Sequence, residues 1–390
     1  MNRRVRELLA WFEQLDGWLM LTVLVLGIFG VAMVYNAGSF TSSSSTHYLV
    51  HQIIRFGLGL GALWFLAGLD YQTLRRPWVN WGLLGLGLGL VLVTVVLRKT
   101  GLVDERAGSS RWLTFLPVQP VEIVKVALVL FLAQQCAGGF ERLRRDDRRF
   151  WTALAVPAVS MVALALQPNY GNAAMMGLLT LVLLTLSGLP ARILVWLGAA
   201  AVGVSALGFF TIAKINHRLV LWWLAIKDGT IDPRADDKLY QVYQSLLGLG
   251  AGGWHGTGIG ASQQRFAFLP DSHTDFIFSV VGEELGLVGG LITLFLFVLL
   301  GWRGYNIARN AGDEFGCLVA AGLTTMLLAY AAINIGMVTA VLPVMGLPLP
   351  FISYGGSALI TNLAAVGILL SIDRQGRALR ARRVRVIGRP

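Results

Sequence analysis

Long apolar runs recur along the whole chain, and each is long enough to cross a lipid bilayer as a helix. The runs lie near residues 18–36, 48–69, 78–97, 119–138, 150–167, 172–188, 190–213, 274–301, 315–340 and 353–373. Only 14% of the 390 residues are charged, and the mean hydropathy is +0.66. A soluble domain carries roughly 25% charged residues. The sequence therefore predicts an all-α, polytopic membrane protein with about ten transmembrane helices.

Basic residues mark one side of the predicted bundle. Arginines precede the first span, follow the second, fourth, sixth and eighth, and dominate the segment after the tenth, RQGRALRARRVRVIGRP. Since cytoplasmic loops are enriched in lysine and arginine, an even number of spans with both termini cytoplasmic puts all these sites on one side. The net charge of +11 then reflects topology and contact with anionic lipid. The basic runs lack interleaved aromatic residues, which argues against nucleic acid as a partner.

We expect a single transmembrane domain over residues 1–390. Residues 1–16 place apolar side chains at helical spacing and are expected to lie along the membrane surface. Residues 374–390 form a basic cytoplasmic tail. The longest loop, 214–273, separates the seventh and eighth spans on the opposite, extracytoplasmic face. Long loops often carry function, so the chemistry is expected on that face.

The stretch FLPDSHTDFIFSVVGEELG concentrates ionisable groups where this loop enters the eighth span. These groups are Asp271, His273, Asp275, Glu283 and Glu284. Ionisable groups at membrane depth are costly and indicate a functional site by default. A structural alternative stays open, because an aspartate before a helix can accept backbone N–H bonds and interact with the helix dipole. At least one of the two glutamates is expected to face the protein interior and have a partner there.

Two further features lie within or between spans. Glu122 and Lys125 are one helical turn apart in the fourth span, so they can pair, either as a structural ion pair or as the lining of a substrate cavity. The proline- and glycine-containing LPVMGLPLPFISYGGSAL lies between the ninth and tenth spans, where such backbone must be buried in protein or line a wet cavity. Its candidate ligand-binding residues, with hydroxyl or backbone N–H donors, are Ser353, Tyr354, Gly355, Gly356 and Ser357.

Five motifs together resemble the SEDS family (shape, elongation, division and sporulation). They are GSSRWL at 108–113, QPVEIVK at 119–125, YQVYQSLLGLGAGGWHGTGIGAS at 240–262, LPDSHTDFIFSVVGEELG at 269–286 and LPVMGLPLPFISYGGSAL at 342–359. Their order is similar to that in the family, and GEELG and GASQQRFAFLP resemble its FtsW branch more than its RodA branch. The glycine-rich GLGAGGWHGTGIG lacks the Gly-Lys-Ser/Thr ending of a nucleotide-binding loop, so we do not assign it to phosphate.

The resemblance implies a peptidoglycan glycosyltransferase of the bacterial cytoplasmic (inner) membrane. Such an enzyme polymerises lipid II, an undecaprenyl-pyrophosphate-linked disaccharide peptide, outside the membrane. Its implied partners are a class B penicillin-binding protein and division or elongation regulators. Asp275 matches the family's essential carboxylate, which would accept the proton of the attacking sugar 4-hydroxyl. An α-linked donor and a β-linked product imply one inverting displacement. We expect no obligatory cofactor; Mg²⁺ or Mn²⁺ could assist pyrophosphate, but no metal-ligand cluster is visible.

The leaving pyrophosphate needs positive charge beside it. The cations expected on the outer face or in the upper part of a span are Arg111, Lys125, Lys214, Arg218 and Arg265. Arg111 and Lys125 lie within matched motifs, whereas the loop cations can equally contact lipid headgroups. His273 could tune the carboxylate, bind pyrophosphate or simply be solvated.

One motif departs from the family pattern. Where the family usually shows Gln-Pro-Asp-x-Gly-Thr, this chain has QPNYGN, so Asn169 stands in place of an acid and offers no carboxylate for a supporting role. The expected process is cell division, and three other functions stay open: the elongation (RodA-type) polymerase, a lipid II flippase and an inactive scaffold. A transporter places its key charge near the membrane midplane, whereas Asp275 is predicted at the outer rim, which favours the polymerase.

Overall fold

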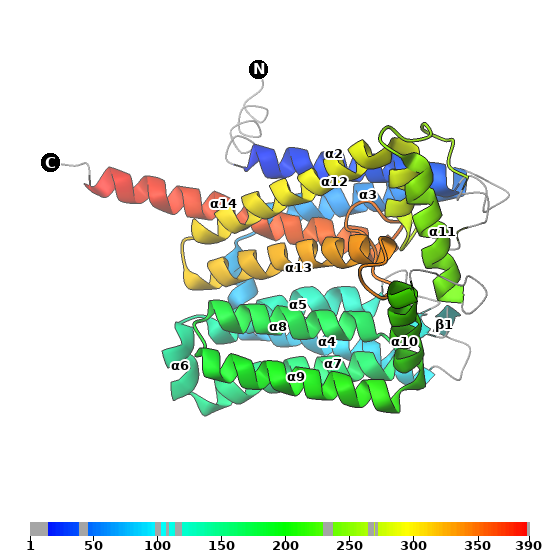
Figure 1. Ribbon diagram of the computed structural model, residues 1–390. Helices are drawn as coiled ribbons and strands as arrows, with labels where there is room; N and C mark the ends of the chain where they lie inside the picture. The colour runs from blue at the N-terminus through cyan, green and yellow to red at the C-terminus, as the bar shows by residue number, and fades with distance from the viewer. Residues whose placement is uncertain are drawn as a thin grey trace, which may run out of the picture.

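The computed structural model describes residues 15–38, 46–97, 103–106, 109–113, 119–228, 237–263, 269 and 272–387. Its long helices lie side by side in one bundle (Figure 1). Ten of them overlap the ten predicted spans: α2 (Gly17–Gly38), α3 (Thr46–Gly68), α4 (Pro77–Val96), α5 (Pro120–Cys136), α7 (Asp147–Leu166), α8 (Tyr170–Leu186), α9 (Ala191–Thr211), α12 (Ile277–Arg309), α13 (Glu314–Val338) and α14 (Gly356–Ile387).

Eight of these helices are long and apolar enough to cross a membrane on their own. The exceptions are α5, which qualifies only together with α6 (Gly139–Arg145) across an 84° bend, and α8, an apolar helix of 17 residues. Seventeen residues is the lower limit for a spanning helix. The prediction of a helical, polytopic membrane protein is confirmed, while the number of spans stays a prediction.

Shorter elements lie at the two ends of the bundle. One end, on the right in Figure 1, carries α10 (Ala213–Asp228), α11 (Asp237–Gly252) and the antiparallel hairpin of β1 (Val103–Arg106) and β2 (Ser109–Leu113). We name it the loop end. The opposite end, which we name the basic end, carries α6, the short η1 (Tyr71–Arg75) and the C-terminal part of α14. The two predicted outer loops therefore contain secondary structure of their own, and the hairpin is a small addition to the all-α class.

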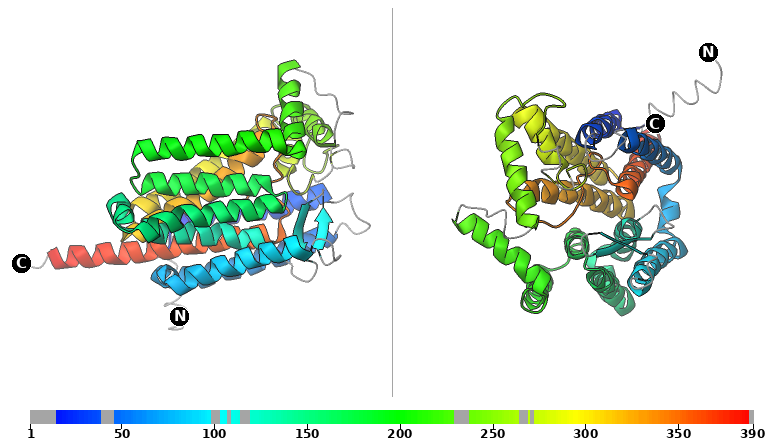
Figure 2. Two further views of the ribbon diagram at one scale, coloured as in Figure 1. Left: turned by 90° about the horizontal axis from the view of Figure 1, so that it is seen from below. Right: turned by 90° about the vertical axis from the view of Figure 1, so that its right-hand side faces the viewer.

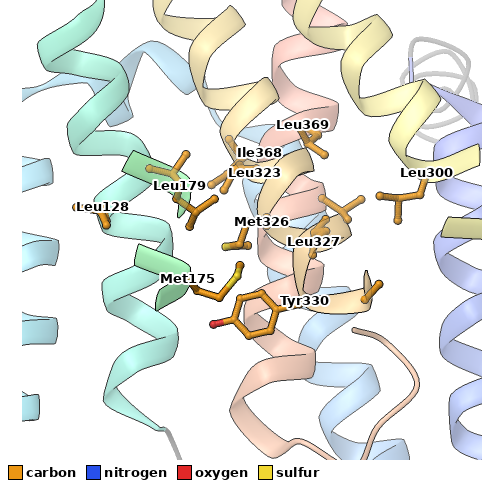
Figure 3. Close-up of a cluster of buried hydrophobic side chains, with 14 of the residues drawn as sticks. Leu128, Met175, Leu179, Leu300, Leu323, Met326, Leu327, Tyr330, Ile368 and Leu369 are labelled. Carbon is orange, nitrogen blue, oxygen red and sulfur yellow. The ribbon is translucent and has the colours of Figure 1, made fainter. Parts of the chain in front are cut away.

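The centre of the bundle is an apolar core around α13. Figure 3 shows its side chains meeting those of α5, α8, α12 and α14. The labelled members are Leu128, Met175, Leu179, Leu300, Leu323, Met326, Leu327, Tyr330, Ile368 and Leu369, all of them buried. In contrast, α9 lies at the periphery in the end-on view of Figure 2, and none of its described side chains is buried. Because lipid is as apolar as such a core, close packing rather than the hydrophobic effect joins helices here.

Residues 341–355, between α13 and α14, are not helical and pass back into the loop end of the bundle. Their second half is buried, as the sequence predicts for irregular backbone at this depth. Gly30 of α2 makes room for this segment, since a Cβ atom at Gly30 would lie 2.4 Å from the carbonyl oxygen of Phe351. The segment is therefore held by close backbone packing as well as by hydrogen bonds.

The helix α12 is broken at Gly286, where φ is 67° and ψ is −164°. This left-handed φ is favourable only for glycine. The break separates residues 277–285, which we name the half-helix, from the rest of α12. Helical hydrogen bonds are interrupted at such a break, so the freed backbone groups need other partners.

Residues 252–258, which we name the glycine strap, supply those partners. The bonds are Thr257 N to Glu283 O at 2.9 Å, Gly258 N to Glu284 O at 3.1 Å, Leu287 N to Gly253 O at 2.8 Å and Val288 N to Trp254 O at 3.2 Å. A Cβ atom at Gly256 would lie 2.1 Å from the oxygen of Glu284. The glycine-rich motif thus serves to dock backbone against backbone across the break.

Candidate functional site

Asp275 lies in a turn at the loop end, residues 272–276, which we name the aspartate turn. Three successive carbonyl oxygens of this turn accept hydrogen bonds from outside it. The bonds are Tyr354 N to His273 O at 2.9 Å, Ser353 Oγ to Thr274 O at 2.6 Å and Asn334 Nδ2 to Asp275 O at 2.8 Å. The backbone that carries the Asp275 carboxylate is therefore fixed from both α13 and the 341–355 segment.

Asp275 itself is half-buried and lies two residues before α12, whose N-cap residue is Phe276. A capping role of the Asp275 carboxylate therefore stays open beside a catalytic one. His273 is packed rather than simply solvated: its ring centroid lies 4.7 Å from that of Tyr48 and 5.6 Å from that of Tyr354. Aromatic packing thus adds a third anchor beside Asp275.

A chain of buried polar groups runs from α5 through α13 to α8. Lys125 Nζ lies 2.6 Å from Glu122 Oε2, as their spacing predicts, and 4.3 Å from the ring centroid of Tyr330. The Tyr330 hydroxyl donates to Asn172 Oδ1, and Asn172 Nδ2 donates to Asn169 Oδ1 at 2.9 Å. Buried charges need paired and hydrogen-bonded surroundings. The two amides of QPNYGN therefore extend the surroundings of Lys125 without adding charge.

The face of α13 joins this polar chain to the aspartate turn. Asn334 lies one helical turn beyond Tyr330, so both side chains project from the same face. Its Nδ2 donates to the carbonyl oxygens of Asp275 and Leu347, at 2.8 and 2.7 Å. Tyr330 closes the apolar cluster of Figure 3. Polar contacts begin where this cluster ends, at the loop end of the bundle.

The sequence reasoning missed Arg55 of α3. Its guanidinium carbon lies 4.6 Å from the ring centroid of Tyr354, and a Cβ atom at Gly356 would lie 3.0 Å from it. Within the described ranges, its buried Nη1 has no hydrogen-bond partner, nor has Oε1 of the fully buried Gln52 one turn away. A lone arginine inside a 23-residue apolar helix was the available signal, because intramembrane charge indicates function.

The serines of the 341–355 segment and its border hold backbone in place. Ser353 Oγ donates to the aspartate turn and accepts from Leu349 N at 2.8 Å, and Ser357 Oγ accepts from Gln119 N at 3.0 Å. Gly355 N donates to the oxygen of Ser353 at 2.9 Å. We therefore place these residues in the framework of the site, and any contact with sugar or phosphate stays a prediction.

Both glutamates of the half-helix face the interior, each with a partner. Glu283 accepts from Ser262 Oγ and, at 2.7 Å, from Gln263 N; Glu284 accepts from Asn36 Nδ2 of α2 at 3.1 Å. Each glutamate is 1% exposed. The expectation that at least one would be partnered is confirmed for both.

The remaining predicted cations are not brought together with Asp275 by any described contact. Arg218 is half-buried on α10. The backbones of Arg111, on β2, and Lys214, on α10, are described, but their side chains lie outside the description. Arg265 and Asp271 fall outside the described residues altogether. Their proposed roles stay predictions.

Metal binding finds no support in the described ranges, where no group of three or more His, Cys, Asp or Glu side chains could hold an ion. Assistance of the leaving pyrophosphate by Mg²⁺ or Mn²⁺ stays a prediction.

These features define a helical membrane protein with a charged site at one end of its bundle, built around a broken helix and an irregular buried segment. The sequence profile of the cell cycle protein family that comprises FtsW, RodA and SpoVE matches residues 17–378. This chain belongs to that family, which confirms the resemblance seen in the motifs.

Individual relatives are similar over nearly their full length. The chain is 35% identical to the probable peptidoglycan glycosyltransferase FtsW of Geobacter metallireducens, covering 96% of this chain and 98% of that protein. It is 34% identical to stage V sporulation protein E of Bacillus subtilis, covering 93% and 98%. Among solved structures, a chain of a peptidoglycan synthase complex that coordinates polymerization and crosslinking superposes with a TM-score of 0.73 at 27% identity, covering 93% and 98%.

Proposed function

We propose that this protein is a peptidoglycan glycosyltransferase that polymerises lipid II, and that Asp275 is its general base. The observation that supports this role is the fixing of the aspartate turn, in which three successive carbonyls are held from α13 and the 341–355 segment. A general base must be held in place relative to the proton it abstracts. The relatives named peptidoglycan glycosyltransferases support the reaction class.

The proposed reaction is a single displacement at the anomeric carbon of the donor. The 4-hydroxyl oxygen of the acceptor sugar attacks this carbon while the bond to the pyrophosphate oxygen breaks. The Asp275 carboxylate takes the hydroxyl proton, which makes the oxygen a stronger nucleophile. The pyrophosphate leaves with the bonding electron pair and needs no proton. One displacement inverts the anomeric configuration, so no covalent intermediate with the protein is required.

Positive charge for the leaving group is available at two places. Arg55 has a buried Nη1 without a partner in the described chain and lies against Gly356, the first residue of α14. A helix N-terminus carries partial positive charge, so this region favours an anion. Lys125 is already paired with Glu122. We therefore place the pyrophosphate beside Arg55 and give the Glu122–Lys125 pair an orienting role.

The loop end suits a substrate with a polar head and a membrane-bound tail. Asp275 precedes a long apolar helix, which supports a position at the rim of the hydrocarbon region rather than at its midplane. Apolar surroundings strengthen the field of each fixed charge. We propose that this end is extracytoplasmic, in a bacterial inner membrane, since the arginine-rich segments gather at the basic end. A flippase, in contrast, needs its key charge accessible from both sides.

A transpeptidase of the class B penicillin-binding type is the partner that we propose, in cell division. The solved relative belongs to a complex that coordinates polymerization with crosslinking. The helix α10 offers Trp223, which is 59% exposed, whereas the neighbouring Trp222 donates to the carbonyl of Ala340 at 2.9 Å. The helix α10 thus contacts the residues that follow α13 through Trp222 and exposes Trp223. We propose that the partner docks on α10 and influences the site through this contact.

The test is polymerisation of labelled lipid II by the purified protein with its transpeptidase partner. Asp275→Asn keeps the size of the side chain but removes its basic lone pair, so polymerisation should fall roughly 10²–10⁴-fold while lipid II binding persists. Glu284→Gln, at a buried acid of the half-helix that follows Asp275, is the matched control and should stay near the wild-type rate. A folded Asp275→Asn protein with a near wild-type rate would contradict the role of Asp275.

A further inference from the structure

The half-helix and the aspartate turn form a unit that is separated from the rest of α12. The break at Gly286 removes the continuity of helical hydrogen bonds, so the remainder of α12 alone does not set the direction of the half-helix. Its direction must come from the segments packed against it. Because Asp275 lies two residues before the half-helix begins, a change in that direction moves Asp275 too.

The described contacts that set this direction come largely from the segment that precedes Asp275 in sequence. Ser279 Oγ donates to the oxygen of Ser245 in α11 at 2.9 Å. The backbones of α11 and the half-helix are in direct contact, since a Cβ atom at Gly252 would lie 1.9 Å from the oxygen of Gly282. The glycine strap then crosses the break, and after it Ser262 and Gln263 bind the side chain of Glu283.

We name these contacts of residues 245–263 with the half-helix the clamp. Glu283 is the one charged side chain among its described contacts. Its two oxygens accept hydrogen bonds from the hydroxyl of Ser262 and the backbone N–H of Gln263, which lie 21 and 20 positions earlier in the chain. Hydrogen bonds to an ionised acceptor are roughly twice as strong as neutral ones. The side chain of Glu284 differs although it is equally buried, because its described partner is Asn36 of α2. Only its backbone oxygen accepts a hydrogen bond from the strap, from Gly258 N.

We propose that Glu283 is a positioning residue for Asp275: by holding residues 262–263 against the half-helix, it fixes the direction of the half-helix and with it the place of the catalytic carboxylate. This inference rests on the proposed function of Asp275. A displacement of about 1 Å can cost roughly 10²-fold in rate. Loss of the clamp therefore lowers kcat. KM for lipid II should change little, because the proposed substrate-binding residues Arg55 and Lys125 make no described contact with the clamp.

The experiment compares Glu283→Ala, Glu283→Gln, Ser262→Ala and Glu284→Ala in the lipid II polymerisation assay with the partner present. Glu283→Ala is expected to lower kcat roughly 100-fold with KM within about 3-fold of wild type. Glu283→Gln keeps one carbonyl acceptor and should recover about a tenth of the wild-type rate or more. Ser262→Ala, which leaves the Gln263 bond intact, should lower kcat several-fold. Glu284→Ala is the matched control, with kcat per folded protein within about 3-fold of wild type.

The wild-type protein and Asp275→Asn are measured in the same assay. An inactive wild-type protein or an active Asp275→Asn protein would contradict the proposed function itself, independently of the role of Glu283. Equal losses of kcat per folded protein in Glu283→Ala and Glu284→Ala overturn the positioning role, and so does a wild-type kcat in Glu283→Ala. If Glu283→Ala does not fold, unchanged kcat in both Glu283→Gln and Ser262→Ala overturns it instead.

Discussion

The two ends of the bundle differ in how completely their arginines are paired with carboxylates. At the basic end, Asp16 is buried and pairs with Arg303 of α12 and Arg377 of α14, and Arg377 also pairs with Asp373 at 2.8 Å. At the loop end, Arg55 is described with an aromatic ring over its guanidinium and a buried nitrogen without a partner.

The backbone is also more regular at the basic end than at the loop end. The part of α12 towards the basic end has helical backbone angles from Leu287 to Arg309, whereas its other part is broken at Gly286 and clamped by the glycine strap. Local strain and unsatisfied groups gather at functional sites. The difference is that the basic end pairs its buried charges, while the loop end keeps one half-buried cation without a described carboxylate partner, as the proposed pyrophosphate site requires.

The largest expected contrast is in accessibility. We expect a membrane-impermeant maleimide to label His255→Cys on the glycine strap in intact cells and to leave Ala378→Cys of α14 unlabelled until the membrane is opened. Both positions are exposed in the structure, and the native Cys136 and Cys317 are first replaced by serine. Labelling of position 378 in intact cells would reverse the proposed orientation.

Removing a buried ion pair at the basic end should lower the stability of the protein rather than its activity. Asp16→Asn leaves Arg303 without its buried counter-ion, and loss of one partner of a buried pair costs about 3–5 kcal/mol. Thermal unfolding followed by tryptophan fluorescence in detergent measures the loss, with the polymerisation rate per folded protein unchanged. Glu141→Gln is the matched control, since its pair with Arg144 is exposed and such pairs contribute about 0–1 kcal/mol. Equal melting temperatures for both variants would remove the contrast.

Removing the charge of Arg55 at the loop end should lower the activity of the protein rather than its stability. Arg55→Met takes away a cation that has no described carboxylate partner, so the melting temperature should stay level or rise. Polymerisation should fall roughly 10²-fold, because the leaving pyrophosphate loses a fixed positive charge. Arg55→Lys keeps the charge without the planar fork of the guanidinium and should fall between. A less stable but fully active Arg55→Met protein would assign Arg55 to packing alone.

The smallest effect is expected at Tyr71, the first residue of η1 at the basic end. Its hydroxyl donates to Asp313 Oδ1 at 2.7 Å, and burial, together with this carboxylate, raises the pKa of Tyr71 well above its usual range. The neutral phenol is therefore favoured by folding, and this contribution is present below about pH 10 and is lost as the pH rises further. Tyr71→Phe should cost about 1 kcal/mol at neutral pH. The free energy of unfolding of Tyr71→Phe should also fall less steeply than that of the wild type as the pH rises above about 10. An equally steep fall in the variant would assign the pH dependence to other groups.

The parts of this structure that follow from local pattern were predictable. Hydropathy located the ten helices because spanning length is a property of contiguous residues. The Glu122–Lys125 contact followed from spacing within one helix, and the family motifs pointed to Asp275. The irregular segment before α14 was predictable from its prolines and glycines, because such backbone must be buried in protein.

What could not be predicted depends on contacts between distant segments. Arg55 belongs to the site only because α3 packs against the 341–355 segment, some 300 residues later in the chain. The role of the strap required knowing that Gly286 breaks a helix which the sequence makes look continuous. The hydrogen bonds of Ser353 and Ser357 to backbone groups could not be predicted either, because the identity of a hydrogen-bond partner is a property of the fold.

The contact between Asn172 Nδ2 and Asn169 Oδ1 has an evolutionary consequence. Both residues depart from the usual Gln-Pro-Asp-x-Gly-Thr pattern, and here they touch each other, with Asn172 also accepting the hydroxyl of Tyr330. An isolated change at either position alters the partner of the other inside an apolar core, where an unmatched polar group costs about 1–3 kcal/mol. The effect of a substitution at either position therefore depends on the residue at the other, so the two positions are expected to vary together among relatives.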